Sequence, residues 1–204
     1  MHHIPDYLMW TVPHSGTRYT KTAFERAGLS AQHGYRWGAI DRDKPDLLWG
    51  HVDSHHMHHE LGEIASHVEK QFLVTRNPID VWTTWMYEPA AHDDADDKVG
   101  HAMFSLEDHW RAQNELAERG LHIHRVDMDS LEDLGKWAGL DLSAHDVTYT
   151  KGINPLKEAV ANRDEEAIEK AIKNTGGWKR FKRDAKIYAP FYEQLGYDIW
   201  WKNG

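Results

Sequence analysis

The stretch WTVPHSGTRYTKTAFERAG, residues 10–28, joins an apolar run, a polar turn and a segment with helical spacing. The turn HSGTR contains one glycine, Gly16, which permits backbone angles that other residues resist. Backbone N–H groups at the start of a helix, helped by the helix dipole, are suited to hold an anion such as a phosphate. The stretch therefore predicts an anion-binding loop, with Arg18 and Lys21 adding positive charge. The same residues are also compatible with an ordinary strand-to-helix turn.

A second polar segment, RNPIDVWTTW at residues 76–85, begins where another apolar run ends. Arg76 is followed by a helical pattern that starts with proline, and Thr84 lies about two turns into that pattern. A guanidinium and a nearby hydroxyl can together bind an anion. The alternative interpretation is a structural arginine that caps neighbouring carbonyl groups.

A third segment, NTGGWKRFKRD at residues 174–184, combines glycines with basic side chains. Gly177 would let the backbone approach a ligand, and Lys179 is one of several Lys and Arg residues here. Such a concentration of positive charge stands out in a chain whose formal net charge is −9. The alternative is a solvated basic helix face.

Histidines dominate the segment HVDSHHMHHE at residues 51–60, which has five of them and two carboxylates. His51 and His55, and likewise His55 and His59, have i, i+4 spacing, and neutral imidazoles bind Zn²⁺, Ni²⁺ or Cu²⁺. The zinc-protease motif H-E-x-x-H is absent. Metal binding is therefore an alternative function.

The elements that must position these residues alternate between strands and helices. Short apolar runs predict strands at residues 7–12, 47–52, 71–75 and 121–126. Helical patterns lie between and after them, at residues 17–27, 60–70, 79–87, 105–120 and 158–186. This alternation predicts an α/β fold with a mostly parallel sheet covered on both faces. Ligands bind at the carboxyl ends of such strands, which here means after Val12, Trp49 and Thr75.

Composition limits the classes of function. The 204 residues, 40% of them apolar, fit a single domain over residues 1–204. The absence of cysteine excludes disulfides, thiol catalysis and cysteine metal sites. The charge of −9 argues against nucleic acid as a partner, although protonating all sixteen histidines would change it to +7. Without a signal-peptide pattern or an apolar stretch long enough for a membrane span, we expect a soluble, cytoplasmic protein.

Together the three polar segments resemble the sulfotransferases that use 3′-phosphoadenosine 5′-phosphosulfate (PAPS). VPHSGTRY resembles the 5′-phosphosulfate loop of that family, commonly PKSGTTW, and TRNPIDVWTTW resembles its 3′-phosphate motif, RNPxDxxxS. GGWKRF resembles its late GxWKxxF-type segment, and FYEQLGYD near the end of the chain is also similar. The motifs keep the family's order and span roughly residues 8–198. The resemblance implies a three-layer α/β/α architecture with a P-loop-like nucleotide site.

The resemblance also implies roles for individual residues. The donor-binding residues would be His14, Ser15, Gly16, Thr17 and Arg18 at the 5′-phosphosulfate, Arg76 and Thr84 at the 3′-phosphate, and Gly177 and Lys179 closing over it. His14 stands where many members have a lysine that stabilises the leaving phosphate. Either a protonated His14 takes that role, or Arg18 or Lys21 supplies the charge. Trp178 would be mainly structural.

The implied reaction is transfer of a sulfuryl group from PAPS to a hydroxyl or amine, with PAP as the product and no metal required. His51 matches the histidine that serves as general base in soluble members, and His55 and His56 are the reserves. The acceptor would be a small molecule or a glycan, and neither its identity nor the oligomeric state can be predicted.

Two alternative functions stand beside the metal site. A nucleotide kinase or NTPase needs G-x-x-x-x-G-K-[ST], which PHSGTRYTKT does not supply. A catalytically inactive PAP(S)-binding protein with this fold remains an alternative because of His14.

Overall fold

The computed structural model describes residues 2–12, 15–34, 36–51, 60–90, 108–142, 156–172 and 177–203. Its contacts divide the chain into two compact units. The sheet unit consists of residues 1–76 and 115–150, and the helical unit consists of residues 77–114 and 151–204. Whether both units fold as the single domain predicted from the sequence stays a prediction.

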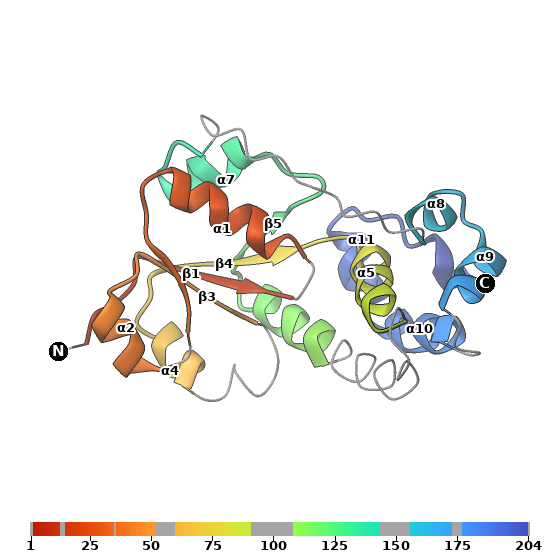
Figure 1. The fold of residues 1–204 in the computed structure, drawn as a ribbon, viewed down its shortest axis with the longest axis horizontal. Helices are drawn as coiled ribbons and strands as arrows, with labels where there is room; N and C mark the ends of the chain where they lie inside the picture. The colour runs from red at the N-terminus through yellow and green to blue at the C-terminus, as the bar shows by residue number, and fades with distance from the viewer. Residues whose placement is uncertain are drawn as a thin grey trace. The chain divides into compact units, whose positions relative to one another are not determined.

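A five-stranded parallel sheet forms the centre of the sheet unit (Figure 1). The strand order is β2-β3-β1-β4-β5, with bounds Ala31–His33 (β2), Leu47–His51 (β3), Tyr7–Thr11 (β1), Lys70–Thr75 (β4) and His122–Arg125 (β5). Every residue of the central strand β1 is buried, as expected for a parallel strand with both faces covered. The α/β fold class with a mostly parallel sheet is therefore confirmed.

Helices cover the sheet on both faces. In Figure 1, α1 (Thr17–Arg26) and α7 (Leu131–Ala138) lie above the sheet, whereas α2 (Trp37–Asp43) and α4 (Glu60–Ala65) lie below it. This confirms the three-layer arrangement. The predicted helix at residues 60–70 was too long, because Lys70 is already the first residue of β4.

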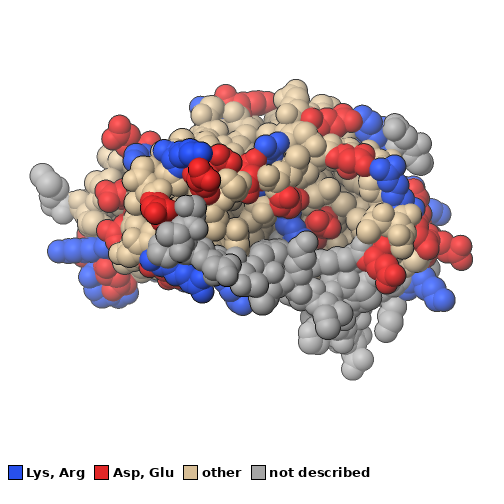
Figure 2. Space-filling model, turned by 90° about the horizontal axis from the view of Figure 1, so that it is seen from above, with Lys and Arg blue, Asp and Glu red and all other residues tan. Residues whose placement is uncertain are grey.

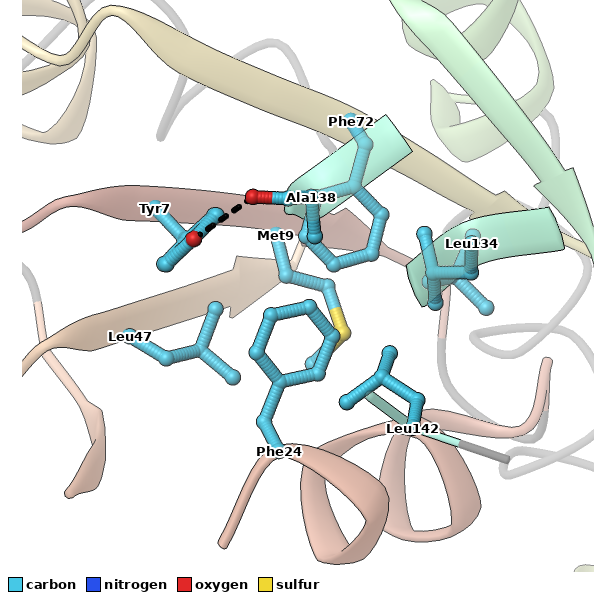
Figure 3. Packing of buried hydrophobic residues seen from close by; sticks show 9 residues of the cluster. Tyr7, Met9, Phe24, Leu47, Phe72, Leu134, Ala138 and Leu142 are labelled. Carbon is cyan, nitrogen blue, oxygen red and sulfur yellow. Dashed lines mark hydrogen bonds between the residues drawn. The ribbon is translucent and has the colours of Figure 1, made fainter. Parts of the chain in front are cut away.

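The core of the sheet unit lies between the sheet and the helices α1 and α7 (Figure 3). Phe24 of α1 stacks on Phe72 of β4, with ring centroids 5.6 Å apart. The hydroxyl of Tyr7 donates a hydrogen bond to the carbonyl oxygen of Ala138 at 2.8 Å, which satisfies a polar group at the edge of this apolar cluster. The cluster holds α1 against the sheet and thereby fixes the loop that precedes α1.

The helical unit contains α5 (Pro78–Ala90), α8 (Leu156–Ala161), α9 (Glu165–Ile172), α10 (Gly177–Ala185), η1 (Lys186–Tyr188), α11 (Ala189–Gln194) and η2 (Trp200–Asn203). Residues 108–118 are also helical and cross from one unit to the other along the chain. The core of this unit is aromatic, with Trp82, Trp110, Trp178, Phe181 and Trp201 all fully buried. Packing therefore explains several of the ten tryptophans.

On the face drawn in Figure 2, basic and acidic side chains are interspersed, a pattern typical of a solvated surface. None of the helices described is long and apolar enough to cross a membrane.

Candidate functional site

Three predicted site elements of the sheet unit lie at the carboxyl edge of the parallel sheet. β1 ends at Thr11, and the register pairs Thr11 with His51, the last residue of β3. On the other side Thr11 pairs with Val74 of β4, and Arg76 follows that strand directly. The edge thus carries the loop after β1, His51 and Arg76. This is where ligands bind in open parallel sheets.

Gly16 gives the loop after β1 its shape. Its φ of +99° lies in the left-handed region, and it caps the start of α1. A Cβ atom at this position would lie 2.7 and 2.8 Å from the two methyl carbons of Val126, the residue that follows β5. Both the backbone angle and the close contact therefore require glycine here.

Hydroxyl groups tie the loop to the end of β1. The Thr11 hydroxyl contacts the hydroxyls of Ser15, at 3.2 Å, and Thr17. Ser15 donates from its Oγ to the carbonyl oxygen of Val12 at 2.6 Å, and its amide donates to the same oxygen at 3.1 Å. Ser15 and Thr17 therefore stabilise the loop, and a contact of either hydroxyl with a ligand stays a prediction.

The amides that follow are available for an anion. In the part of the chain that the structure describes, no residue accepts a hydrogen bond from the N–H groups of Gly16, Thr17 or Arg18. The first intrahelical bond of this turn is donated by the Thr20 amide to the Gly16 carbonyl oxygen, at 3.0 Å. Unsatisfied N–H groups at the start of a ten-residue helix carry partial positive charge. The loop is therefore suited to a phosphate or sulfate group.

His51 lies beside two other rings on the same face of the sheet. Its ring centroid is 6.0 Å from that of Trp49 and 5.6 Å from that of His33, the last residue of β2. His33 and Trp49 are 4.2 Å apart and are register partners. His51 is half-buried, and histidine is the side chain that most often serves as a general base. The reserves His55 and His56, like His14 in the loop, lie outside the described residues.

Arg76 is buried, with only 5% of its surface exposed. A guanidinium in such a position needs polar partners because burying an unpaired charge is costly, and Arg76 does take part in further interactions. Arg76 directly follows β4, as the sequence predicted, and its contact with an anion stays a prediction.

Three predicted residues belong to the helical unit. Thr84 of α5 donates from its hydroxyl to the carbonyl oxygen of Asp80 at 2.7 Å, and a hydroxyl in this state can still accept a hydrogen bond. Gly177 is the first residue of α10, and Lys179 is exposed on the same helix. Whether Thr84, Gly177 and Lys179 share a site with Arg76 stays a prediction. Trp178 is buried and donates from Nε1 to Glu165 at 2.9 Å, which agrees with a structural role.

His124 is a titratable residue near this edge that the sequence did not single out. It is the register partner of Val74, so it lies in the same row across the sheet as Thr11 and His51. Only 1% of its surface is exposed, and no described residue forms a hydrogen bond with its Nε2. Burial lowers the pKa of His124 to about 4, although Asp129 opposes the shift. The alternation of His122, His124 and Val126 in a predicted strand was the signal that could have found it.

Among the residues the structure describes, no group of three or more His, Asp or Glu side chains is placed to hold a metal. The histidine cluster at residues 51–60 lies outside the described residues except at its two ends.

Comparison with known proteins supports the fold. No protein-family model matches the chain, and no curated protein matches it significantly. Among solved structures, the chain is similar to the crystal structure of mouse sulfotransferase SULT7A1 complexed with PAP, with a TM-score of 0.50 and 14% sequence identity. The similarity covers 67% of this chain, and the chain spans 59% of that one. The chain therefore has a sulfotransferase-like α/β fold.

Proposed function

We propose that this protein is a PAPS-dependent sulfotransferase that transfers a sulfuryl group to a hydroxyl or amine and releases PAP. The observation that carries the proposal is the carboxyl edge of the sheet. There, a glycine-shaped loop with unsatisfied amides lies one strand from His51 on one side and one strand from the position of Arg76 on the other. The fold likeness and the order of the three sequence motifs support the same function.

The donor set fits PAPS chemically. The loop amides that have no acceptor among the described residues suit the 5′-phosphosulfate. Gly16 adds no side chain to the loop, and Val126 occupies the place where its Cβ would lie. Arg76 suits a second phosphate because a guanidinium can form two parallel hydrogen bonds with it. Thr84, Gly177 and Lys179 would complete the 3′-phosphate site. We therefore propose PAPS as the donor. The proposed reaction requires no metal ion.

When bound, PAPS supplies an activated sulfuryl group. His51 would accept the proton of the acceptor hydroxyl, a contribution of about 10²- to 10⁴-fold for a general base. The amides of Gly16, Thr17 and Arg18 would stabilise the negative charge that develops on the phosphate. Removal of one preorganised donor of this kind typically costs about 3–4 kcal/mol of transition-state stabilisation.

We propose a small molecule or a glycan as the acceptor. The exposed His33 and the half-buried Trp49 flank His51 and would contact a bound acceptor first.

Thermal unfolding with PAP, ADP, AMP and ATP–Mg²⁺ in parallel tests the donor site. A ligand at 100 times its Kd adds about 2.7 kcal/mol to the free energy of unfolding. We expect a large rise in Tm with PAP and a small one with AMP. Equal shifts with ADP and PAP would contradict a 3′-phosphate site, and a shift with ATP–Mg²⁺ alone would favour a kinase.

Turnover is then measured with sulfur-labelled PAPS and a panel of acceptors. Transfer of the label to any acceptor would establish that the protein is a sulfotransferase. Tight PAP binding without transfer to any of them would instead favour the inactive PAP-binding protein.

A further inference from the structure

The general base proposed for this site must lose its proton again after each cycle. His51 would take one proton from the acceptor, and it can take the next only after the first has left. His51 is half-buried at the end of β3, so only part of its surface is open to bulk water. A second proton acceptor between His51 and the solvent would therefore serve the reaction.

His33 is the histidine that lies beside His51 at this edge. It is the last residue of β2, the edge strand next to β3, and it is exposed. The two ring centroids are 5.6 Å apart, with an angle of 60° between the ring planes. Two imidazoles joined by a hydrogen bond of about 3 Å between nitrogen atoms have centroids about 5 Å apart. The observed separation is therefore short enough for a proton to pass between the rings directly or through one water molecule.

Trp49 holds the two imidazoles in this arrangement. It is the register partner of His33, and their rings lie 4.2 Å apart with 38° between the planes. Trp49 also meets His51 edge to face, at 6.0 Å and 84°. Trp49 is itself packed against the core of the sheet unit. The position of the exposed His33 ring is therefore set by packing on a half-buried ring, beside His51.

The exposure of these residues gives a proton path one direction. On the side of β1, the register partner of His51 is Thr11, which is fully buried and carries a hydroxyl that does not titrate. Thr11 also donates its hydroxyl hydrogen to the carbonyl oxygen of Val12, at 3.0 Å. On the side of β2, His33 is both titratable and exposed. A proton that leaves His51 toward β2 therefore reaches water through one further imidazole.

We propose that His33 is a positioning residue that acts through His51, by receiving the proton that His51 takes from the acceptor; the inference rests on the proposed function. As the acceptor oxygen bonds to sulfur, the bond between sulfur and the phosphate oxygen breaks, and its electron pair stays on the phosphate oxygen of PAP. The acceptor proton moves to a ring nitrogen of His51, which then donates a proton to a ring nitrogen of His33. His33 releases a proton to water or buffer, and both rings are neutral again.

Turnover at increasing concentrations of free imidazole tests this role. The assay follows labelled PAPS with p-nitrophenol, N-acetylglucosamine and tyramine as acceptor probes. His33→Phe keeps a ring beside Trp49 and removes both nitrogen atoms. We expect its kcat to fall about 10-fold, less than the loss of a direct general base, with the KM for PAPS within about twofold of the wild type. Free imidazole should restore kcat in the variant, because it can take the proton from His51, and should leave the wild-type rate unchanged.

His67→Phe is the matched control. His67 is also an exposed histidine near a tryptophan, with its ring centroid 5.9 Å from that of Trp37, but it precedes β4 and so lies at the opposite end of that strand from the carboxyl edge. Its rate and its response to imidazole should equal those of the wild type. A wild-type rate in His33→Phe would overturn the inference. A loss of rate that imidazole does not restore would also overturn it, because packing alone would then explain the effect.

NMR of protein labelled at histidine, in buffer containing EDTA, tests the contact between the rings without donor or acceptor. A proton on one ring opposes a proton on its neighbour, so the signals of His33 and His51 should each change in two steps as the pH is lowered. In His33→Phe, the His51 signals should change in one step. Independent single steps in the wild type would overturn the inference. Two-step changes in a protein that transfers no label to any probe would instead overturn the proposed function, on which the proton path depends.

Discussion

The buried His124 makes the stability of this protein sensitive to mild acid. Its side chain lies on β5, facing the same core as Val74, and only 1% of it is exposed. Burial favours the neutral imidazole and lowers the pKa of His124 to about 4, against an ordinary value of 6.5. The unfolded chain therefore binds a proton at His124 more readily than the folded chain does.

The sign and size of the effect follow from these two values. Stability is complete above pH 6.5 and falls as the pH decreases toward 4, because protons bind preferentially to the unfolded state. The full difference between the two pKa values, about 2.5, corresponds to about 3.4 kcal/mol. Between pH 7.5 and pH 5.0, about 2 kcal/mol of the free energy of unfolding should be lost through His124.

Urea unfolding at pH 7.5 and pH 5.0 measures this loss in the wild type and in His124→Met. Methionine is apolar and similar in volume, so it fills the site without titrating. His122, stacked on Trp137 at 4.5 Å, also has a pKa lowered by burial, but its contribution is common to both proteins. Between pH 7.5 and pH 5.0, the free energy of unfolding of the variant should therefore fall by about 2 kcal/mol less than that of the wild type. Equal losses in the two proteins would refute the argument.

Three further predictions concern the carboxyl edge of the sheet. Gly16→Ala should lower the free energy of unfolding by about 2 kcal/mol in urea titrations, because a Cβ would clash with Val126 and φ is +99°. Adding Val126→Ala should recover only part of the loss, and full recovery would exclude backbone strain. Arg76→Ala should weaken PAP binding at least tenfold in calorimetry but leave ADP binding nearly unchanged, whereas equal losses would remove Arg76 from the 3′-phosphate role. His51→Ala should reduce the turnover of labelled PAPS at least about 100-fold and leave the affinity for PAP unchanged. Normal turnover in this variant would show that another residue is the general base.

Much of the sheet could be predicted from the sequence because its strands are compact apolar runs. The runs at residues 7–12, 47–52, 71–75 and 121–126 correspond to β1, β3, β4 and β5 within one residue at each end. β2 could not be predicted in this way. Its three residues, Ala-Gln-His, form a partly buried edge strand and contain no apolar run.

The candidate site was predictable in part for the same reason. The loop at residues 15–18, His51 and Arg76 follow directly from where strands end, and parallel strands share one edge. His33 could not be placed beside His51, since their proximity arises from pairing between β2 and β3. The inward orientation of the Ser15 hydroxyl was likewise unpredictable because it depends on the local path of the loop.

The contact between Gly16 and Val126 also concerns the order of folding. The loop belongs to the first strand–helix unit of the chain, but the side chain that packs against it is made about 110 residues later. Contacts this distant in sequence form late, since the intervening chain must first be ordered. A nascent chain that has completed β1 and α1 would still lack the support for the loop proposed to bind an anion. The nucleotide binding proposed for this loop would therefore require that β5 and the turn beyond it have been synthesised and have joined the sheet.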